Sequence, residues 1–290
     1  MRIEVYAAHW GNNELPPEVF IDKVLEAGFD GIEMSLPLDA ALREEWTDRI
    51  AKSGLQLIAA QWETVFHSDF ELHRAALAEL LENACLARPV LVNTHTGKDY
   101  YSQAQNAQLL DLAAAISAKH GVPIVHEIHR SRFSGHPMLL LPYLAQYPAL
   151  PLTADLSHWC CACESLLEDQ PQTLAQVLPL VRHVHARVGH AQGPQVADFR
   201  APEAKAALDA HLAWWDAIVA LRRAAGAERM TFTPEFGPAP YTQTLPWTQQ
   251  PVTDAWEQNV AMLNVLRARY AGEVAAIRRR IARSGAAHCY

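Results

Sequence analysis

The sequence predicts a single (β/α)8 barrel, from its length, the number of its short β-rich runs and the helical patterns between them. A barrel of eight strand–helix units typically needs about 250 residues, and this chain has 290. Eight β-rich runs alternate with helical patterns, and eight is the number that a closed barrel needs. No shift in composition and no long sequence repeat divides the chain. Residues 1–290 are therefore expected to form one domain, with 282–290 as a flexible tail.

The expected strands are short runs rich in apolar and β-branched residues, at positions 3–6, 31–34, 55–60, 90–94, 123–127, 152–155, 183–185 and 230–235. The helical patterns between them have recognisable ends. Pro16 and Pro17 are typical of the start of a helix, and Gly28 is typical of its end. Gly54 and Gly121 stand at the same kind of junction, where a later helical pattern gives way to a strand. The chain therefore alternates strand and helix throughout.

Two connections are long and rich in Pro and Gln, at residues 189–202 and 237–251. Both follow expected strands at their carboxyl ends, where the loops of a barrel surround the ligand site, so we expect them to cover a site. The longest helical stretches are expected at 203–225 and 254–281. Their tryptophans and arginines fit the outer ring of one barrel and equally fit contact with a second copy, so a homo-oligomer stays open.

Composition and charge exclude several classes of protein. The chain has 24 Lys and Arg against 32 Asp and Glu, a net charge of -8, which would repel the phosphate backbone of a nucleic acid. No run has the pattern of a secretory signal or a membrane span, so we expect a cytoplasmic protein without a membrane partner. The five cysteines form an odd set that indicates a reducing compartment. Cys160 and Cys163 have no second pair to complete a zinc site and are expected to act as small apolar residues.

Acidic residues and one histidine recur at the ends of four consecutive strands. Glu127 ends the fifth expected strand, Asp155 the sixth, His185 the seventh and Glu235 the eighth. Because all strands of a barrel run parallel, their carboxyl ends meet on one rim, where these side chains converge. Three carboxylates in contact repel one another, and a divalent cation is the simplest way to keep them ionised. The four residues therefore predict a metal site.

The predicted ligands are mainly oxygen atoms with a single imidazole. Such a set suits a hard or borderline ion with five or six ligands, which favours Mn²⁺, with Mg²⁺, Co²⁺ and Zn²⁺ as alternatives. We expect one divalent ion and find no sequence motif for a nucleotide cofactor.

At these residues the chain resembles the xylose isomerase-like barrels, which include sugar phosphate isomerases and epimerases, ketose 3-epimerases and inosose dehydratase. The resemblance covers most of the chain and rests on the order of Glu127, Asp155, His185 and Glu235 at strands five to eight, and on the spacing of Asp155 and His158. It implies an isomerase or epimerase that acts on a sugar-derived substrate through an enediolate. It also implies that Glu127 and Glu235 move protons to and from carbon, and that His158 contacts the substrate.

Cationic residues near the predicted metal site differ from the ketose epimerase pattern. Arg187 lies two residues after His185 and would either clamp an anionic group of the substrate or form a salt bridge that orients Asp155 or Glu127. His129 and Arg130 add to the same rim. These residues favour an oxidised or phosphorylated sugar as the substrate.

Other polar and aromatic residues at the strand ends are expected to line the pocket. For Glu33 and His95, contact with the substrate and structural hydrogen bonding are equally good interpretations, since buried polar groups need partners in either case. Trp62 fits an apolar wall for one face of a sugar, and it equally fits the core.

Two other reaction classes remain as alternatives. A metal-dependent lyase or dehydratase is favoured next, because the same enediolate can expel a leaving group instead of being reprotonated. An endonuclease IV-like phosphodiesterase is less favoured, because strand three ends in Gln61 and Trp62 where such a multi-zinc site needs histidine. A barrel that only binds ligands is expected to lack a metal ligand, and all four are present.

Overall fold

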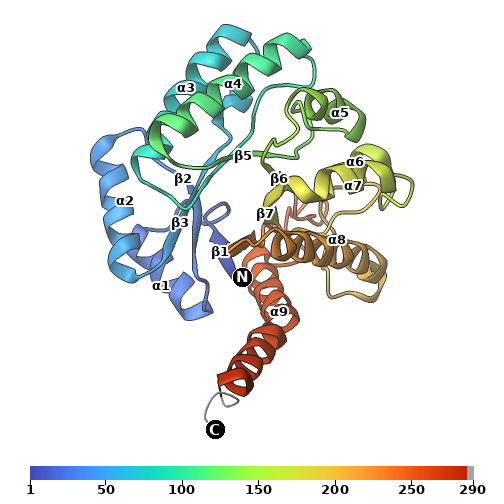
Figure 1. The fold of residues 1–290 in the computed structure, drawn as a ribbon. Helices are drawn as coiled ribbons and strands as arrows, with labels where there is room; N and C mark the ends of the chain where they lie inside the picture. The colour runs from blue at the N-terminus through green and yellow to red at the C-terminus, as the bar shows by residue number, and fades with distance from the viewer. Residues whose placement is uncertain (286–290) are drawn as a thin grey trace.

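The computed structural model describes the backbone of residues 1–285 and the side chains of residues 1–270. Eight parallel strands form a closed barrel in which each strand pairs with the next and β8 pairs with β1 (Figure 1). The strands are β1 Arg2–Ala8, β2 Gly31–Ser35, β3 Gln56–Gln61, β4 Val92–Thr94, β5 Ile124–Glu127, β6 Leu152–Ala154, β7 Val181–His185 and β8 Arg229–Thr233. The structure thus confirms the predicted (β/α)8 barrel and all eight predicted strands, each within two residues at either end.

Helices surround the barrel (Figure 1). The α-helices are α1 Pro17–Ala27, α2 Ala40–Ser53, α3 Phe70–Leu86, α4 Gln103–His120, α5 Pro137–Gln146, α6 Ser157–Cys163, α7 Pro171–Val177, α8 Lys205–Ala224 and α9 Ala255–Gly285, with 3-10 turns at Glu63–Phe66, Leu178–Leu180 and Pro202–Ala204. Gly28, Gly54 and Gly121 end α1, α2 and α4 at positive φ, as predicted, a conformation that glycine adopts without strain. Of the predicted tail, residues 282–285 belong to α9 and residues 286–290 lie outside the described residues.

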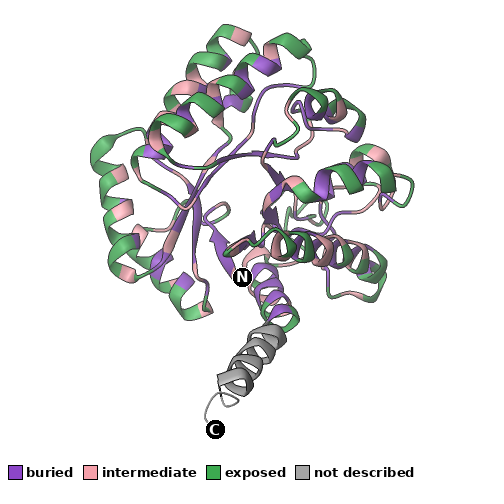
Figure 2. Cartoon of the chain, viewed as in Figure 1, coloured by how far each residue is buried: buried purple, intermediate pink, exposed green. Residues whose placement is uncertain are grey.

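Two apolar layers hold the barrel together, because successive side chains of a strand point to opposite faces. Val5 and the other strand residues that point outward pack against the helices in the main core. Figure 2 shows the resulting pattern of buried strands and exposed outer helix faces. A second, smaller cluster fills the barrel interior, with Tyr6, Ile58, Leu91 and Val125. Two positions beyond Leu91 and Val125, on the same face, stand Asn93 and Glu127. The interior therefore changes from apolar to polar toward the carboxyl ends of the strands.

The two long loops are joined to each other above β7 and β8. The side chain of Gln195 accepts a hydrogen bond from the Gly237 amide at 2.8 Å and donates to the Gly237 carbonyl at 3.3 Å and to Thr242 at 3.1 Å. Each loop thereby fixes the other. Among the described residues no helix has both the length and the apolar character needed to cross a bilayer, and Cys85, Cys160, Cys161 and Cys163 form no disulfide there.

His211 of α8 ties the first long loop to that helix. Its Nδ1 lies 2.8 Å from the carbonyl of Ala207, and the Gly189 amide donates to its Nε2 at 3.3 Å. A neutral ring, protonated on Nδ1 alone, satisfies both contacts. Burial lowers the pKa of His211 to about 4, and the nearby charge of Arg187 adds to that effect against the raising effect of the Ala207 contact.

This burial makes stability depend on pH. The folded ring stays neutral down to about pH 4, whereas an unfolded histidine takes up a proton near pH 6.5, so stability is lost as pH falls through this window. The contribution of His211 is about 3 kcal/mol. We expect His211→Gln to lose that much less stability than the wild type over the window, as measured by urea unfolding. Equal pH dependences would contradict a neutral buried His211.

Candidate metal centre

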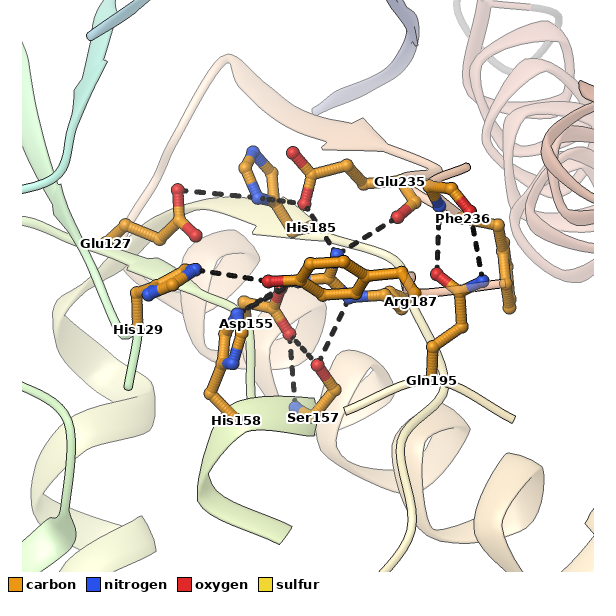
Figure 3. Close-up of polar contacts among 12 residues, drawn as sticks. Glu127, His129, Asp155, Ser157, His158, His185, Arg187, Gln195, Glu235 and Phe236 are labelled. Carbon is orange, nitrogen blue, oxygen red and sulfur yellow. Dashed lines mark hydrogen bonds and ion pairs between the residues drawn. The ribbon is translucent and has the colours of Figure 1, made fainter. Parts of the chain in front are cut away.

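The four predicted ligands meet at the carboxyl ends of β5 to β8. Glu127 is the last residue of β5 and His185 the last of β7, while Asp155 and Glu235 follow β6 and β8 directly or within two residues. One donor atom of each lies within 4.8 Å of the donor atoms of the others. Asp155, Glu127 and His185 are at most 2% exposed. The structure therefore brings these four side chains together (Figure 3), and their role as metal ligands stays a prediction.

His185 is held by Glu33 so that its other ring nitrogen faces Glu127 and Glu235. Its Nε2 lies 3.0 Å from Oε1 of Glu33. Its Nδ1 lies 3.0 Å from Glu235 and 3.5 Å from Glu127 yet makes no well-directed hydrogen bond, although it is fully buried. A carboxylate behind a histidine, with the other nitrogen left facing oxygen ligands, is the usual arrangement of a metal-binding imidazole. The donor set thus fits a divalent ion.

The electrostatics of His185 lead to the same conclusion. Burial alone would lower the pKa of His185, but the charges of Glu235, Glu33 and Glu127 outweigh it and hold this pKa well above its ordinary value. The carboxylates therefore stabilise a positive charge at Nδ1. A proton or a metal ion can provide that charge.

Glu127 is kept ionised by its neighbours. Its Oε2 accepts hydrogen bonds from Nδ2 of Asn93 at 2.7 Å and lies 3.0 Å from Nε2 of His95. Burial would raise the pKa of Glu127, but His95 and His185 hold it well below its usual range. His95 therefore makes the structural contact that was one of its two interpretations, and Glu33 does the same through His185 and His183.

Arg187 lies between two of the predicted ligands. Its guanidinium contacts Oδ2 of Asp155 and lies 3.4 Å from Oε2 of Glu235 (Figure 3). Ser157 donates to the other oxygen of Asp155. Burial raises the pKa of Asp155 to about 6 against the opposing charge of Arg187. The predicted salt bridge of Arg187 to Asp155 is thus present, and Arg187 forms a second ion pair with Glu235. The predicted clamp on a substrate stays a prediction.

A cavity of 430 Å³ opens over this cluster. Its lining includes the predicted residues Glu33, Trp62, His95, Glu127, His129, His185, Arg187 and Glu235. Trp62 is 42% exposed and therefore belongs to the rim and not to the core. Asp155 and His158 are not among the lining residues. His158 is fully buried, with its Nε2 at 2.9 Å from Arg187, and its substrate contact stays a prediction.

The cavity residues that were not predicted as site residues from the sequence include Trp46, Asn93, Arg132 and Tyr241. Asn93 carries a signal in the sequence, since an amide inside a buried strand asks for polar partners. Tyr241 comes from the second long loop, and its ring lies 4.6 Å from the guanidinium of Arg187. Trp46 comes from α2, and nothing in the sequence separates it from ordinary helix packing.

The fold and the site together define a (β/α)8 barrel with a candidate divalent-metal centre at the carboxyl ends of its strands. The sequence matches no model of a known protein family, and a comparison with curated proteins gives no match either. Similarity appears at the level of structure.

Several solved barrels are similar over most of their length. A xylose isomerase-like TIM barrel protein from Mycobacterium smegmatis, in complex with magnesium, is 15% identical with a TM-score of 0.56, over 82% of this chain and 92% of its own. The 3-keto-D-glucoside 4-epimerase of E. coli is 14% identical with a TM-score of 0.57, over 92% and 100%. A probable 3-DHS dehydratase from Bacillus anthracis is 16% identical with a TM-score of 0.58, over 90% and 98%. This chain therefore shares its fold, a TIM barrel, with these proteins, as its resemblance implied.

Proposed function

We propose that this protein is a divalent-metal-dependent isomerase or epimerase that acts on a sugar-derived substrate. The observation that carries the proposal is the cluster of Glu127, Asp155, His185 and Glu235 under a cavity of 430 Å³, with the buried Nδ1 of His185 facing the carboxylates. Cavities of this size suit small molecules. The similar barrels include a magnesium complex, a sugar epimerase and a probable dehydratase, which supports a metal and a carbohydrate substrate.

The four clustered residues would hold the ion, for which Mn²⁺ is favoured and Mg²⁺, Co²⁺ and Zn²⁺ are alternatives. When bound, the ion acts as a Lewis acid that stabilises negative charge on the substrate oxygens. Glu127 and Glu235 stand on either side of His185 at the floor of the cavity, where each can accept or return a proton on a substrate carbon. Glu33 fixes the orientation of His185.

The test combines metal analysis with hydrogen exchange. Protein purified without added metal should contain about one divalent ion per chain, and NMR in D2O should show exchange of a C–H next to a carbonyl in a candidate keto-sugar. Exchange with epimerised or isomerised product supports the proposal. Release of water would assign the protein to the lyase alternative. A protein that takes up no divalent ion would refute both.

Glu33 offers a separate check, because it contacts the predicted ligand His185 at 3.0 Å without being one of the four. We expect Glu33→Gln to weaken metal affinity by about 10- to 100-fold, since the amide no longer supplies the charge that orients His185. Competition with a chelator measures this affinity. Glu79→Gln, at an exposed position of α3, is the matched control. Unchanged affinity in Glu33→Gln would leave substrate contact as the remaining role of Glu33.

A further inference from the structure

Arg132 is a buried cation at the wall of the cavity. It lies in the loop after β5, is 2% exposed and lines the cavity over the candidate metal centre. The only hydrogen bond that its side chain makes to the described residues runs from Nη1 to the backbone carbonyl of Ser131 at 3.0 Å. Its Nε is buried and has no hydrogen-bond partner at all. Most of the donors of this guanidinium are therefore unused.

The charge of Arg132 is also unpaired. Within the part of the chain that the structure describes, no carboxylate lies within 4.0 Å of this guanidinium, whereas Arg187 in the same cavity contacts two. Burial lowers the pKa of Arg132, and the more distant charges of Glu127 and Asp99 oppose that effect. An arginine keeps its proton in a protein, so this site bears a full positive charge at a high cost of desolvation. A bound anion would offset this cost by pairing with the buried charge.

The loop holds Arg132 in place. The Arg132 amide donates to the carbonyl of His129 at 3.2 Å, and its own carbonyl accepts from the amide of Gly135 at 2.9 Å. Ser134 donates to the carbonyl of Glu127 at 2.5 Å, which ties the loop to the last residue of β5. The guanidinium is thus presented from a braced backbone, which reduces the conformational entropy lost when a ligand binds.

A second buried cation lies close by. Lys98 is 4% exposed, and its Nζ donates to the carbonyl of Val65, itself a cavity residue, at 2.9 Å. Burial lowers the pKa of Lys98, the charge of Arg132 lowers it further, and the more distant charge of Asp99 opposes both effects. No carboxylate of the described chain lies within ion-pair distance of Lys98 either. Two buried cations without an ion-pair partner therefore stand on this side of the cavity, although the protein as a whole is acidic.

We propose that Arg132 binds an anionic group of the substrate, a carboxylate or a phosphate, at the β5 side of the cavity. The planar fork of a guanidinium matches the oxygens of either group in a bidentate contact. The inference rests on the proposed function, which makes this cavity the substrate site. It names the substrate class, an acidic or phosphorylated sugar, and it places the anion on Arg132, whereas Arg187 is already engaged by Asp155 and Glu235.

The first test needs no substrate. Chelator-treated protein is titrated with inorganic phosphate and with acetate by calorimetry, and the wild type should bind at least one of them. Arg132→Gln should weaken that binding by about 10- to 100-fold, because charge-assisted hydrogen bonds are lost. Arg88→Gln removes the same charge from an exposed position and should bind as the wild type does. No binding to the wild type, or equal binding to Arg132→Gln, would overturn the proposal. The tighter of the two ions identifies the anionic group.

Folding is checked with the same samples. Arg132→Gln removes an unpaired buried charge, so its melting temperature should not fall, and Arg132→Lys provides a second variant that keeps the charge but lacks the fork. Arg132→Lys should bind more weakly than the wild type and more tightly than Arg132→Gln. If both variants bound the ions as the wild type does, another group would hold the anion and the proposal would be wrong.

The second test separates this inference from the proposed function. Hydrogen exchange is followed for matched pairs of neutral and anionic sugars, and Arg132→Gln should lower kcat/KM for the anionic member by about 10- to 100-fold more than for the neutral member. Exchange on neutral sugars only, unchanged in Arg132→Gln, would keep the proposed function and overturn the role of Arg132. Anion binding at Arg132 in a protein that takes up no metal would do the opposite.

Discussion

Glu235→Gln is expected to lower the rate of C–H exchange by about 100- to 10,000-fold, the usual contribution of a positioned general base. Glu235 is the carboxylate best placed for this role, because its side chain is 18% exposed and lines the cavity. Glu127 is 1% exposed, and its Oε2 is engaged by Asn93 and His95. A base must approach the substrate and release its proton again. This favours Glu235, which is more exposed than Glu127.

Glutamine keeps the shape and one ligand oxygen of glutamate but cannot accept the proton. Measurement of bound metal therefore has to accompany the rate, and most of the metal should be retained when the ion is present in excess. Glu79→Gln, exposed on α3, controls for the loss of one negative charge. Retained metal together with an unchanged rate of exchange would exclude Glu235 as the base and leave Glu127 to be tested in the same way.

The strand tips were predictable from the sequence because two independent patterns coincide there. The alternation of β-rich and helical runs places Glu127 and His185 at strand ends, and the parallel barrel brings such ends together whatever their separation along the chain. An error of one or two residues at a strand boundary did not matter. The face to which a side chain points follows from the alternation along the strand, and that alternation does not depend on where the strand ends. The convergence of the four predicted ligands therefore follows from the fold.

The partners of the arginines were not predictable, because they depend on the path of loops. Arg130 and Arg132 are two residues apart, and the sequence drew attention to Arg130. In the structure Ser131 has a φ of 64°, a conformation that reverses the chain between them. Arg132 is consequently buried in the cavity wall, whereas Arg130 lies over the ring of Tyr241 at 4.8 Å. Tyr241 itself reaches the site from a long loop without regular structure.

Arg187 shows how a single contact changes the interpretation of a site. The sequence left it either as a clamp on the substrate or as a structural salt bridge, and both require a cation at this rim. Only the geometry shows that it contacts Asp155 and Glu235 at once, so that it neutralises two of the four predicted metal ligands when no ion is bound. A bound ion would supply positive charge to the same carboxylates as Arg187.

Arg187→Met is therefore expected to destabilise the metal-free protein by about 3–5 kcal/mol, the usual cost of removing one partner of a buried ion pair. Arg187 is 1% exposed and Asp155 is fully buried, so water cannot replace the lost contact. The free energy of unfolding should be measured well above the Asp155 pKa of about 6, where the carboxylate is ionised. Added Mn²⁺ should then stabilise the variant more than it stabilises the wild type, because the ion provides the missing charge.

Two further variants locate the effect in the ion pair. Arg187→Lys keeps the charge and should lose less stability than Arg187→Met. The double variant Asp155→Asn with Arg187→Met should be more stable than Arg187→Met alone, since no unpaired carboxylate remains at that position. Together with the single variant Asp155→Asn, the cycle gives the coupling energy of the pair. If Arg187→Met were as stable as the wild type without metal, or gained no more from Mn²⁺, the guanidinium and the ion would act on different carboxylates.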